Sequence, residues 1–318
     1  MKNKLLAVLC SSVLSLAVPS ASFADDYPQR NVEVINQFGP GGGTDMFIRA
    51  IGQPFRDITG RNLVGISITG GGGVPAATRF FSTRADGHTL MAIGPEEIIN
   101  STLGRFDLER IQPVARIQYD QGLFYVSKDS PFNTAEELVE HARANPNKVS
   151  IAVTGAAGFD ETLVGLWNFT SEALLSPIPF NTGAESIAAV MGGHADVLYE
   201  EYGAARALLE ADELKPIVLF SDERIPTLPD VPTAKELGFD VTLGRWRGFA
   251  LKADDQPEHA ASLFKIFEEA AQDERYKKIE EQDGLQYRSV ILNPDEFSEF
   301  IKKEQEVYNE VLQKLGHK

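Results

Sequence analysis

Residues 32–45 read Val-Glu-Val-Ile-Asn-Gln-Phe-Gly-Pro-Gly-Gly-Gly-Thr-Asp and decide the fold of this chain. The apolar run 32–38 is typical of a buried strand, and the glycines within 39–43 interrupt it. A helix is expected to begin near Thr44, with Asp45 suitably placed in its first turn. The apolar residues beyond this point recur at helical spacing: Phe47, Ile48, Ile51 and Phe55. The stretch therefore predicts a strand, a glycine loop and a helix in succession.

The same order of elements returns three more times along the chain. The expected strands are 63–69, 149–154 and, more weakly, 178–180, followed by loops 70–73, 155–158 and 181–183. The expected helices are 75–81, one that carries Leu163, Leu166 and Trp167, and one that runs through Ile187 to Met191. Strands that alternate with helices predict α/β layers with largely parallel sheets.

Two segments of similar sequence indicate how the chain is divided. Each has a strand, an acidic turn, a proline and a helix: 122–131 before helix 134–144, and 248–257 before helix 258–271. We interpret them as two crossing strands, at which the chain leaves a first lobe and later returns to it. The alternative is that many α/β units simply look alike.

Two further helices are expected in the second half of the chain. A short helix, 234–237, follows a loop that contains Pro226, Pro229 and Pro232. The last helix, about 294–315, is amphipathic and is expected to pack across the first lobe.

The first 24 residues have the features of a secretory signal peptide. Lys2 and Lys4 precede an apolar run that is too short to span a bilayer, and small residues end at Ala24, which predicts cleavage before Asp25. The only cysteine, Cys10, lies inside this segment, so the mature chain is expected to have neither a disulfide nor a lipid anchor. An exported chain of this length must then be held together by ordinary apolar cores, and it is long enough for two.

The composition limits the possible partners. The 318 residues contain 30 Lys and Arg against 46 Asp and Glu, a formal charge of −16. Such a charge disfavours nucleic acid and anionic membrane surfaces, and solubility is its simplest explanation. A small anionic ligand stays possible, because backbone dipoles near a site can outweigh a screened distant field.

The glycine loops are the best candidates for a ligand site. Glycine after a strand lets backbone N–H groups turn toward a ligand, and the helix that follows adds the positive end of its dipole. Four such loops can converge on one polar cleft, although a single glycine is commonly just turn geometry. None has the spacing of a nucleotide-binding loop.

A search for catalytic groups finds little. The five histidines, His88, His141, His194, His259 and His317, form no His-Glu-x-x-His pair, and no Gly-x-Ser-x-Gly sequence marks a hydrolase nucleophile. The acidic pairs Glu96-Glu97, Asp160-Glu161 and Glu200-Glu201 could include general acids, but solvated loop carboxylates are the simpler expectation. We therefore expect no metal and no cofactor.

Several short runs together resemble one known family. They are Tyr27-Pro28, residues 38–45, the glycines 70–73, Ala85-Asp-Gly-His-Thr-Leu90, Pro113-Val-Ala115, Leu228-Pro-Asp-Val-Pro-Thr233 and Trp246-Arg-Gly248. In this order they resemble the Bug family, the periplasmic substrate-binding proteins of tripartite tricarboxylate transporters. The likeness spans essentially the whole mature chain.

The resemblance implies a type II-like periplasmic binding protein whose two α/β lobes each carry a mixed sheet flanked by helices. The lobes would comprise 25–122 with 247–318, and 123–246, joined at a hinge. A monomer of this kind would capture a small organic acid between its lobes and deliver it to an integral-membrane permease. Two alternatives stay open: an exported lyase or hydrolase that uses carboxylates of the cleft, and a binder of a hydroxylated or amine-bearing ligand.

The resemblance also points to ligand-binding positions. Carried over residue by residue, with the glycine loop 70–73 added, these are Gly41, Gly42, Gly43, Thr44, Asp45, Gly72, Gly73, Ala156, Ala157, Gly158, Phe159, Asp160, Asn181, Thr182, Gly183 and Ala184. The chain departs from the family pattern at Phe180, where a tyrosine is usual, and at Asp160 and Glu161, near which a histidine is often found. These two acids put a plain di- or tricarboxylate ligand in doubt.

Five positions have competing interpretations. Thr44 is expected first as a helix N-cap and second as a ligand residue, and Phe159 is either a lid over the ligand or part of a core. Asp160 either faces the cleft or only caps its helix. Trp246 and Arg247 are equally well explained as packing at the hinge and as a stacking and anion clamp.

Overall fold

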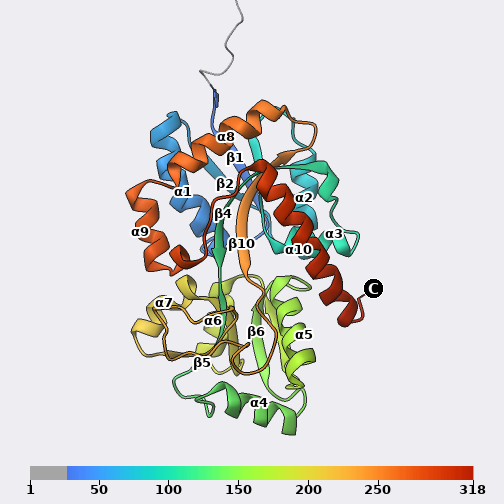
Figure 1. Cartoon of the computed structure of the whole chain (residues 1–318), viewed down its shortest axis with the longest axis vertical. Coiled ribbons are helices and arrows are strands. Elements are labelled where there is room, and N and C mark those ends of the chain that lie inside the picture. Colours follow the sequence, from blue (N-terminus) through green and yellow to red (C-terminus); the bar gives the residue numbers. More distant parts are fainter. Residues whose placement is uncertain (1–26, 318) are drawn as a thin grey trace, which may run out of the picture.

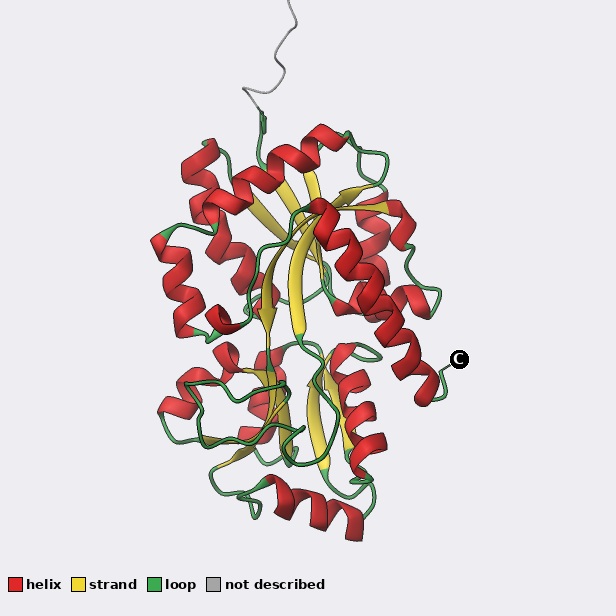
Figure 2. Cartoon of the chain, in the orientation of Figure 1, coloured by secondary structure: helices red, strands yellow, loops and turns green. Residues whose placement is uncertain are grey.

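The computed structural model describes residues 27–317, which fold into two lobes placed end to end (Figure 1). Each lobe is a five-stranded sheet flanked by helices (Figure 2). The two-lobed α/β fold expected from the sequence is confirmed. The signal peptide and its cleavage before Asp25 lie outside the described residues. Within 27–317, no helix is both long enough and apolar enough to cross a membrane.

The first lobe is built on a sheet with the strand order β2-β1-β3-β10-β4. Its strands are β1 (Val32–Asn36), β2 (Leu63–Ser67), β3 (Thr89–Ile93), β4 (Ile111–Asp120) and β10 (Arg245–Lys252). Its helices are α1 (Gly43–Thr59), α2 (Val74–Phe81), α3 (Pro95–Thr102), α8 (Pro257–Ala270), α9 (Glu274–Gln282) and α10 (Pro294–Lys314). Short 3-10 turns lie at Gly71–Gly73, Leu108–Arg110 and Leu285–Tyr287.

The second lobe has the strand order β7-β6-β8-β5-β9. Its strands are β5 (Gly122–Ser127), β6 (Ser150–Thr154), β7 (Ser176–Phe180), β8 (Val197–Glu201) and β9 (Leu214–Leu219). Its helices are α4 (Ala135–Ala144), α5 (Phe159–Ser171), α6 (Gly183–Met191) and α7 (Tyr202–Glu210).

The two sheets have matching layouts. In each, the fourth strand in the order is antiparallel to both of its neighbours, while the neighbouring pairs among the first three strands are parallel. That antiparallel strand is β10 in the first lobe and β5 in the second, and these are the two segments that the sequence comparison paired. The glycine loops after β1 and β6 consequently occupy corresponding places, at the carboxyl ends of parallel strands. Ligands of open α/β sheets bind at such ends.

The lobes are joined by two backbone connections. β4 ends at Asp120 and β5 begins at Gly122, so the chain passes into the second lobe almost without a break. It returns through the segment before β10, which runs between β3 and β4 (Figure 1). The expected crossing strands at the hinge are therefore confirmed.

Helix α10 adds a third link between the lobes. It packs on α3 and β4 of the first lobe and reaches α5 of the second. The ring of Tyr308 meets that of Phe159 edge-on, with 6.4 Å between the centroids, and Leu315 lies directly against Gly165. Residues of both lobes and of α10 thus form one continuous apolar core, and two smaller cores cover the other sheet faces. The expectation that the last helix packs across the first lobe is confirmed, and its contact with α5 extends this packing to the second lobe.

One expected helix is wrong. Residues 234–237 form turns rather than a helix. The side chain of Thr233 accepts from the N–H of Glu236, and Leu237 donates to the carbonyl of Thr233, so one turn does form. It stops there because Gly238 follows with a φ of +87°, a left-handed conformation that ends helices.

Tyr308 provides a test of the link through α10. Its side chain is fully buried, and its hydroxyl has no hydrogen-bond partner among the described residues. Tyr308→Ala should lower the free energy of unfolding by about 3–5 kcal/mol, because it leaves a cavity at the junction of the lobes. Tyr308→Phe removes only the unpaired hydroxyl and should change stability by less than about 1 kcal/mol. Urea unfolding followed by circular dichroism measures both, and equal losses in the two variants would contradict this account.

Candidate functional site

A cavity of about 210 Å³ lies between the lobes, at the carboxyl ends of both sheets. Its wall is formed by loops and helix starts from both lobes. The lining residues are Phe38, Gly39, Gly41, Gly42, Gly43, Thr44, Met46, Thr154, Asp160, Thr182, Gly183, Ala184, Ile187, Glu200, Glu201, Gly203, Ala204, Arg245 and Arg247. A neighbouring cavity of about 120 Å³ shares Phe38 and Thr154 with it and includes the glycine loop 70–73. The site is therefore a cleft with two compartments.

Four helices, α1, α2, α5 and α7, begin at this cleft without a side-chain cap. The N-cap residues of α1 and α5 are Gly42 and Gly158, which have no side chain that could accept from the first-turn N–H groups. The first N–H groups of a helix have no partner within the helix, so the starts of α1 and α5 offer donors and a positive dipole end to a ligand or water. Helix α6 differs, since the Thr182 hydroxyl accepts from the N–H of Glu185.

In the loops before α1, α5 and α6, one backbone N–H group already donates to a carboxylate of the chain itself. The N–H of Gly41 donates to Asp45 Oδ2 at 2.9 Å, four residues later. The same i to i+4 contact joins Ala157 to Glu161 Oε2 at 2.8 Å and Asn181 to Glu185 Oε2 at 3.0 Å. The loops before α1, α5 and α6 are thus each held by a carboxylate of the helix that follows, and negative charge already lies at these three helix starts.

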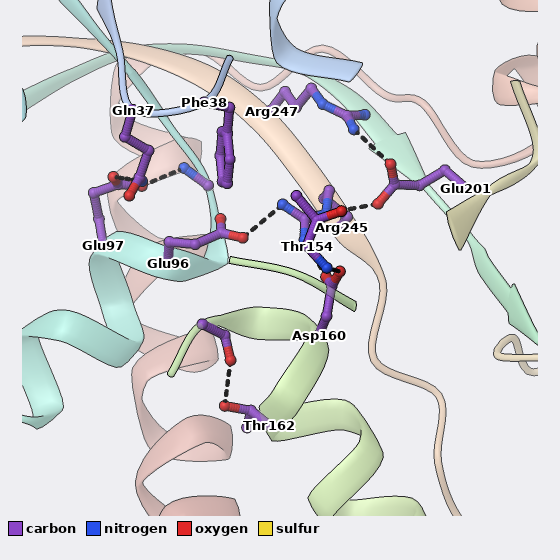
Figure 3. A network of polar contacts seen from close by, with 12 residues as sticks. Gln37, Phe38, Glu96, Glu97, Thr154, Asp160, Thr162, Glu201, Arg245 and Arg247 are labelled. Atoms are coloured by element: carbon purple, nitrogen blue, oxygen red, sulfur yellow. Dashed lines mark hydrogen bonds and ion pairs between the residues drawn. The ribbon is translucent and has the colours of Figure 1, made fainter. Parts of the chain in front are cut away.

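Arg245 is the centre of the charged wall (Figure 3). It enters from β10, is almost completely buried, and pairs with a carboxylate from each of three elements. Its Nη1 lies 2.5 Å from Oε1 of Glu96 at the start of α3, its Nε lies 2.6 Å from Oε1 of Glu201 at the end of β8, and its Nη2 contacts Asp160 of α5. One guanidinium therefore connects the first lobe to two elements of the second.

Arg247 extends this network along the same strand. Its Nη2 lies 3.1 Å from Glu201 Oε2, and its Nη1 lies 3.3 Å from Asp120 Oδ2 at the end of β4. A Cβ atom at Gly43 would lie 2.3 Å from Arg247 Nη2, so only glycine lets the start of α1 approach so closely. Helix α1 of the first lobe is thereby brought against Glu201 of the second.

The charged wall contains more acids than its two arginines can neutralise. As a result, burial raises the pKa values of most of these acids. Burial raises the pKa of Asp160 to about 7 against the attraction of Arg245, and it does the same to Asp120 against Arg247. Burial and then the nearby Glu201 and Asp160 carboxylates raise the pKa of Glu200 well above its usual range. Burial would also raise the pKa of Glu201, but Arg245 and Arg247 outweigh it and hold this pKa below the usual range. At neutral pH the wall therefore retains protons.

Glu97 is buried beside Glu96, the acid that pairs with Arg245. Burial, followed by repulsion from Glu96, raises the pKa of Glu97 to about 8. Its carboxyl group accepts from the Gly94 N–H at 2.7 Å and from Gln37 Nε2 at 2.5 Å.

The structure places most of the expected site residues on the cleft. Gly41, Gly42, Gly43, Thr44, Asp160, Thr182, Gly183 and Ala184 line the larger cavity, and Gly72, Gly73, Ala156, Ala157, Gly158 and Asn181 line the smaller one. Asp45 and Phe159 line neither. Asp45 holds the N–H of Gly41 and pairs with Arg49, and Phe159 is fully buried in the core that spans both lobes.

Several local expectations need correction. Thr44 is not the N-cap of α1, because the helix begins at Gly43 and Gly42 is its cap. Asp160 does not cap α5: it accepts from the N–H of Thr154 at 2.8 Å and pairs with Arg245. Trp246 packs edge-on against Phe297 and donates to Glu304 at 3.1 Å, so it belongs to the hinge packing.

The acidic pairs were also misjudged. Glu96, Glu97, Glu200 and Glu201 are all buried instead of solvated. Arg245 was missed entirely, although a signal was available. It lies two residues before Arg247, and residues i and i+2 of a strand face the same side of a sheet.

Comparisons with known proteins agree with this geometry. Residues 48–317 match the model of the tripartite tricarboxylate transporter family receptor, and the chain belongs to this family. It is 23% identical to the protein BugT of Bordetella pertussis over 99% of this chain and 98% of that protein.

Solved structures show the same fold. The periplasmic binding protein BugD superposes with a TM-score of 0.84 at 22% identity, covering 92% of this chain and 99% of that one. An R. palustris protein solved with adipate gives a TM-score of 0.83 at 22% identity, with the same coverage.

The raised pKa values predict how stability depends on pH. Asp120, Asp160 and Glu97 bind protons more tightly in the folded chain than in an unfolded one, where their pKa values are the ordinary 3.8, 3.8 and 4.5. The unfolded chain therefore loses these protons first as the pH rises, and the free energy of unfolding should fall between about pH 4 and pH 8. Each such proton contributes at most about 1.4 kcal/mol per pH unit.

Asp160→Asn should make this fall shallower, as measured by urea unfolding across the same range. Asp273→Asn is the matched control, because Asp273 lies at the surface with 26% of its side chain exposed, and its hydrogen bonds with Arg275 hold its pKa at about 2. An unchanged slope in Asp160→Asn would show that Asp160 is already ionised in the folded protein.

Proposed function

We propose that this protein is an extracytoplasmic solute receptor that binds a small organic acid in the cleft and delivers it to the membrane subunits of a tripartite tricarboxylate transporter. Membership of the receptor family supports this role, as does the adipate in the R. palustris structure. The observation that carries it is the position of the cavity, whose wall is shared by both lobes. A ligand there would be contacted by both lobes at once.

The donors for such an acid are the starts of α1 and α5. Their N-cap glycines leave first-turn N–H groups without a side-chain partner, and helix starts of this kind bind carboxylates. Among the expected site residues, we propose that those lining the two compartments contact the ligand. The expected lobe boundaries shift slightly, because β5 begins at Gly122 in the second sheet and β10 begins at Arg245 in the first. We therefore assign 27–121 with 245–317 to one lobe and 122–244 to the other, and we expect the receptor to act as a monomer.

Ligand-induced stabilisation tests the receptor role against the enzyme alternative. A screen of carboxylates, hydroxy acids, amino acids and sugar acids should find a compound that raises the melting temperature. A true ligand at about 100 times its dissociation constant contributes about 2.7 kcal/mol. Chromatography should recover it unchanged after long incubation, and its conversion to a product would favour the exported lyase or hydrolase.

Gly42→Val tests the position of the site. Gly42 has a φ of −77° and a ψ of 167°, an extended backbone that valine adopts readily, and a Cβ atom there has no contact closer than 3.5 Å. The variant should therefore fold normally, while its side chain enters the cavity and weakens binding at least about 100-fold in calorimetric titration, because excluding the ligand sterically removes most of its contacts.

Gly52→Ala is the control, since Gly52 lies in the same helix, outside the lining of both compartments. Wild-type affinity in a folded Gly42→Val protein would place the ligand elsewhere.

The export step is tested by N-terminal sequencing. We propose that the protein is periplasmic and that cleavage before Asp25 releases the mature chain, as the sequence of the first 24 residues predicts. The mature protein recovered from the periplasmic fraction should start at Asp25. A periplasmic protein that retains Met1 would contradict the proposed processing.

A further inference from the structure

We propose that the Glu200–Glu201 end of the larger cavity binds an ammonium group, so that the ligand is an amine-bearing organic acid and not a plain carboxylate. This inference rests on the proposed receptor function and adds the chemical class of the ligand. It is carried by the distribution of charge around the cavity and by the surroundings of Glu200.

Acids outnumber cations in the cavity wall. Asp160, Glu200 and Glu201 line the cavity together with Arg245 and Arg247. Both guanidinium groups are already directed at carboxylates of the chain, including Glu96 and Asp120, which lie outside the lining of this compartment. The Nη groups of both arginines are therefore engaged by carboxylates of the chain, while their Nε atoms, which donate no hydrogen bond among the described residues, are shielded from solvent.

Glu200 is the acid without a cation. Among the described residues, no Lys, Arg or His lies within ion-pair distance of its carboxylate, although Glu200 is 7% exposed and lines the cavity. Its Oε1 accepts from the N–H of Glu201 at 3.1 Å, and its carboxyl group also hydrogen-bonds with the carboxyl group of Glu201, a contact that requires a proton on one of the two acids. A buried carboxylate is costly unless a partner compensates it.

The glycine at the start of α6 keeps this carboxylate accessible. A Cβ atom on Gly183 would lie 2.4 Å from Glu200 Oε2, so any larger residue at this position would collide with that oxygen. Gly183 itself lines the cavity. Glu200 Oε2, which accepts from no backbone N–H group of the described residues, is therefore the oxygen that lies beside Gly183 and the cavity.

An ammonium group would replace the protons that the wall retains. Burial and the neighbouring Glu201 and Asp160 carboxylates raise the pKa of Glu200, and burial raises the pKa of Asp160 to about 7. A cation bound between these groups stabilises their ionised forms and releases protons to the solvent. An uncharged hydroxyl would not do so.

The donors for the acid end of the ligand are close by. A Cβ atom at Gly43, the first residue of α1, would lie 3.4 Å from Glu201 Oε2, so the helix start and the acidic end belong to the same small space. A cavity of about 210 Å³ then fits a ligand whose carboxylate and amine are only a few bonds apart.

Matched pairs of probes test the inference by calorimetric titration at neutral pH. The pairs are glutarate with glutamate, and butanoate with 4-aminobutanoate, which differ only by the amine. In at least one pair, the wild-type protein should bind the amine member about 30-fold more tightly or better, as expected for a buried charge pair. Glu200→Gln should remove this preference, while the exposed-site control Glu210→Gln should keep it.

A second measurement does not depend on any variant. Titration of the wild-type protein in two buffers of different ionisation enthalpy should show proton release with the amine member and not with its partner. Equal or tighter binding of the plain acids, without proton release, would overturn the amine inference and leave the receptor function in place. Binding of no probe from either pair would overturn the inference together with the organic-acid class.

Discussion

The buried guanidinium of Arg245 is the interaction on which the cleft depends. It is paired with Glu96 of the first lobe and with Asp160 and Glu201 of the second. Removing one partner from a buried ion pair typically costs about 3–5 kcal/mol, because the remaining charge stays desolvated. The two lobes are therefore held together at the point where the cavity lies. A motion that opens the cleft has to supply another partner, water or ligand, to each of these groups.

The matching layout of the sheets explains why the charged groups meet there. Glu96 follows β3 and Glu201 ends β8, and these strands hold the third place in their respective sheets. Corresponding positions of two facing lobes thus supply two acids to one arginine on the returning strand. The glycine loops after β1 and β6 correspond in the same way. Each half of the cleft repeats a strand, an open backbone turn and a helix start.

The parts of the site that are local in sequence could be predicted. A glycine loop between a strand and a helix involves neighbouring residues, and loops 39–43 and 155–158 accordingly reached the cleft as expected. The charged wall could not be predicted, since Glu96, Asp160 and Arg245 are separated by 64 to 149 positions and their pairing depends on the hinge. Adjacent acids such as Glu200 and Glu201 look solvated in a sequence, because nothing nearby shows that both will be buried or that only Glu201 will meet an arginine. The family resemblance places Phe159 among the ligand positions, with a core position as the alternative, and the ring lies in the core that α10 completes.

The position of α10 also determines on which side the cleft can open. The helix lies along the α3 and α5 side of the molecule, whereas α1, α7 and α9 lie on the opposite side (Figure 1). Met46, at 41% exposed, and Gly203 and Ala204 of α7 line the cavity on that opposite side. Because α10 holds the two lobes together on its own side, the lobes should separate on the opposite side. The contact between Tyr308 and Phe159 would then lie near the axis of this rotation. We therefore expect solutes to enter past Met46, and a label or tag joined to the C-terminus would be near the edge that moves least.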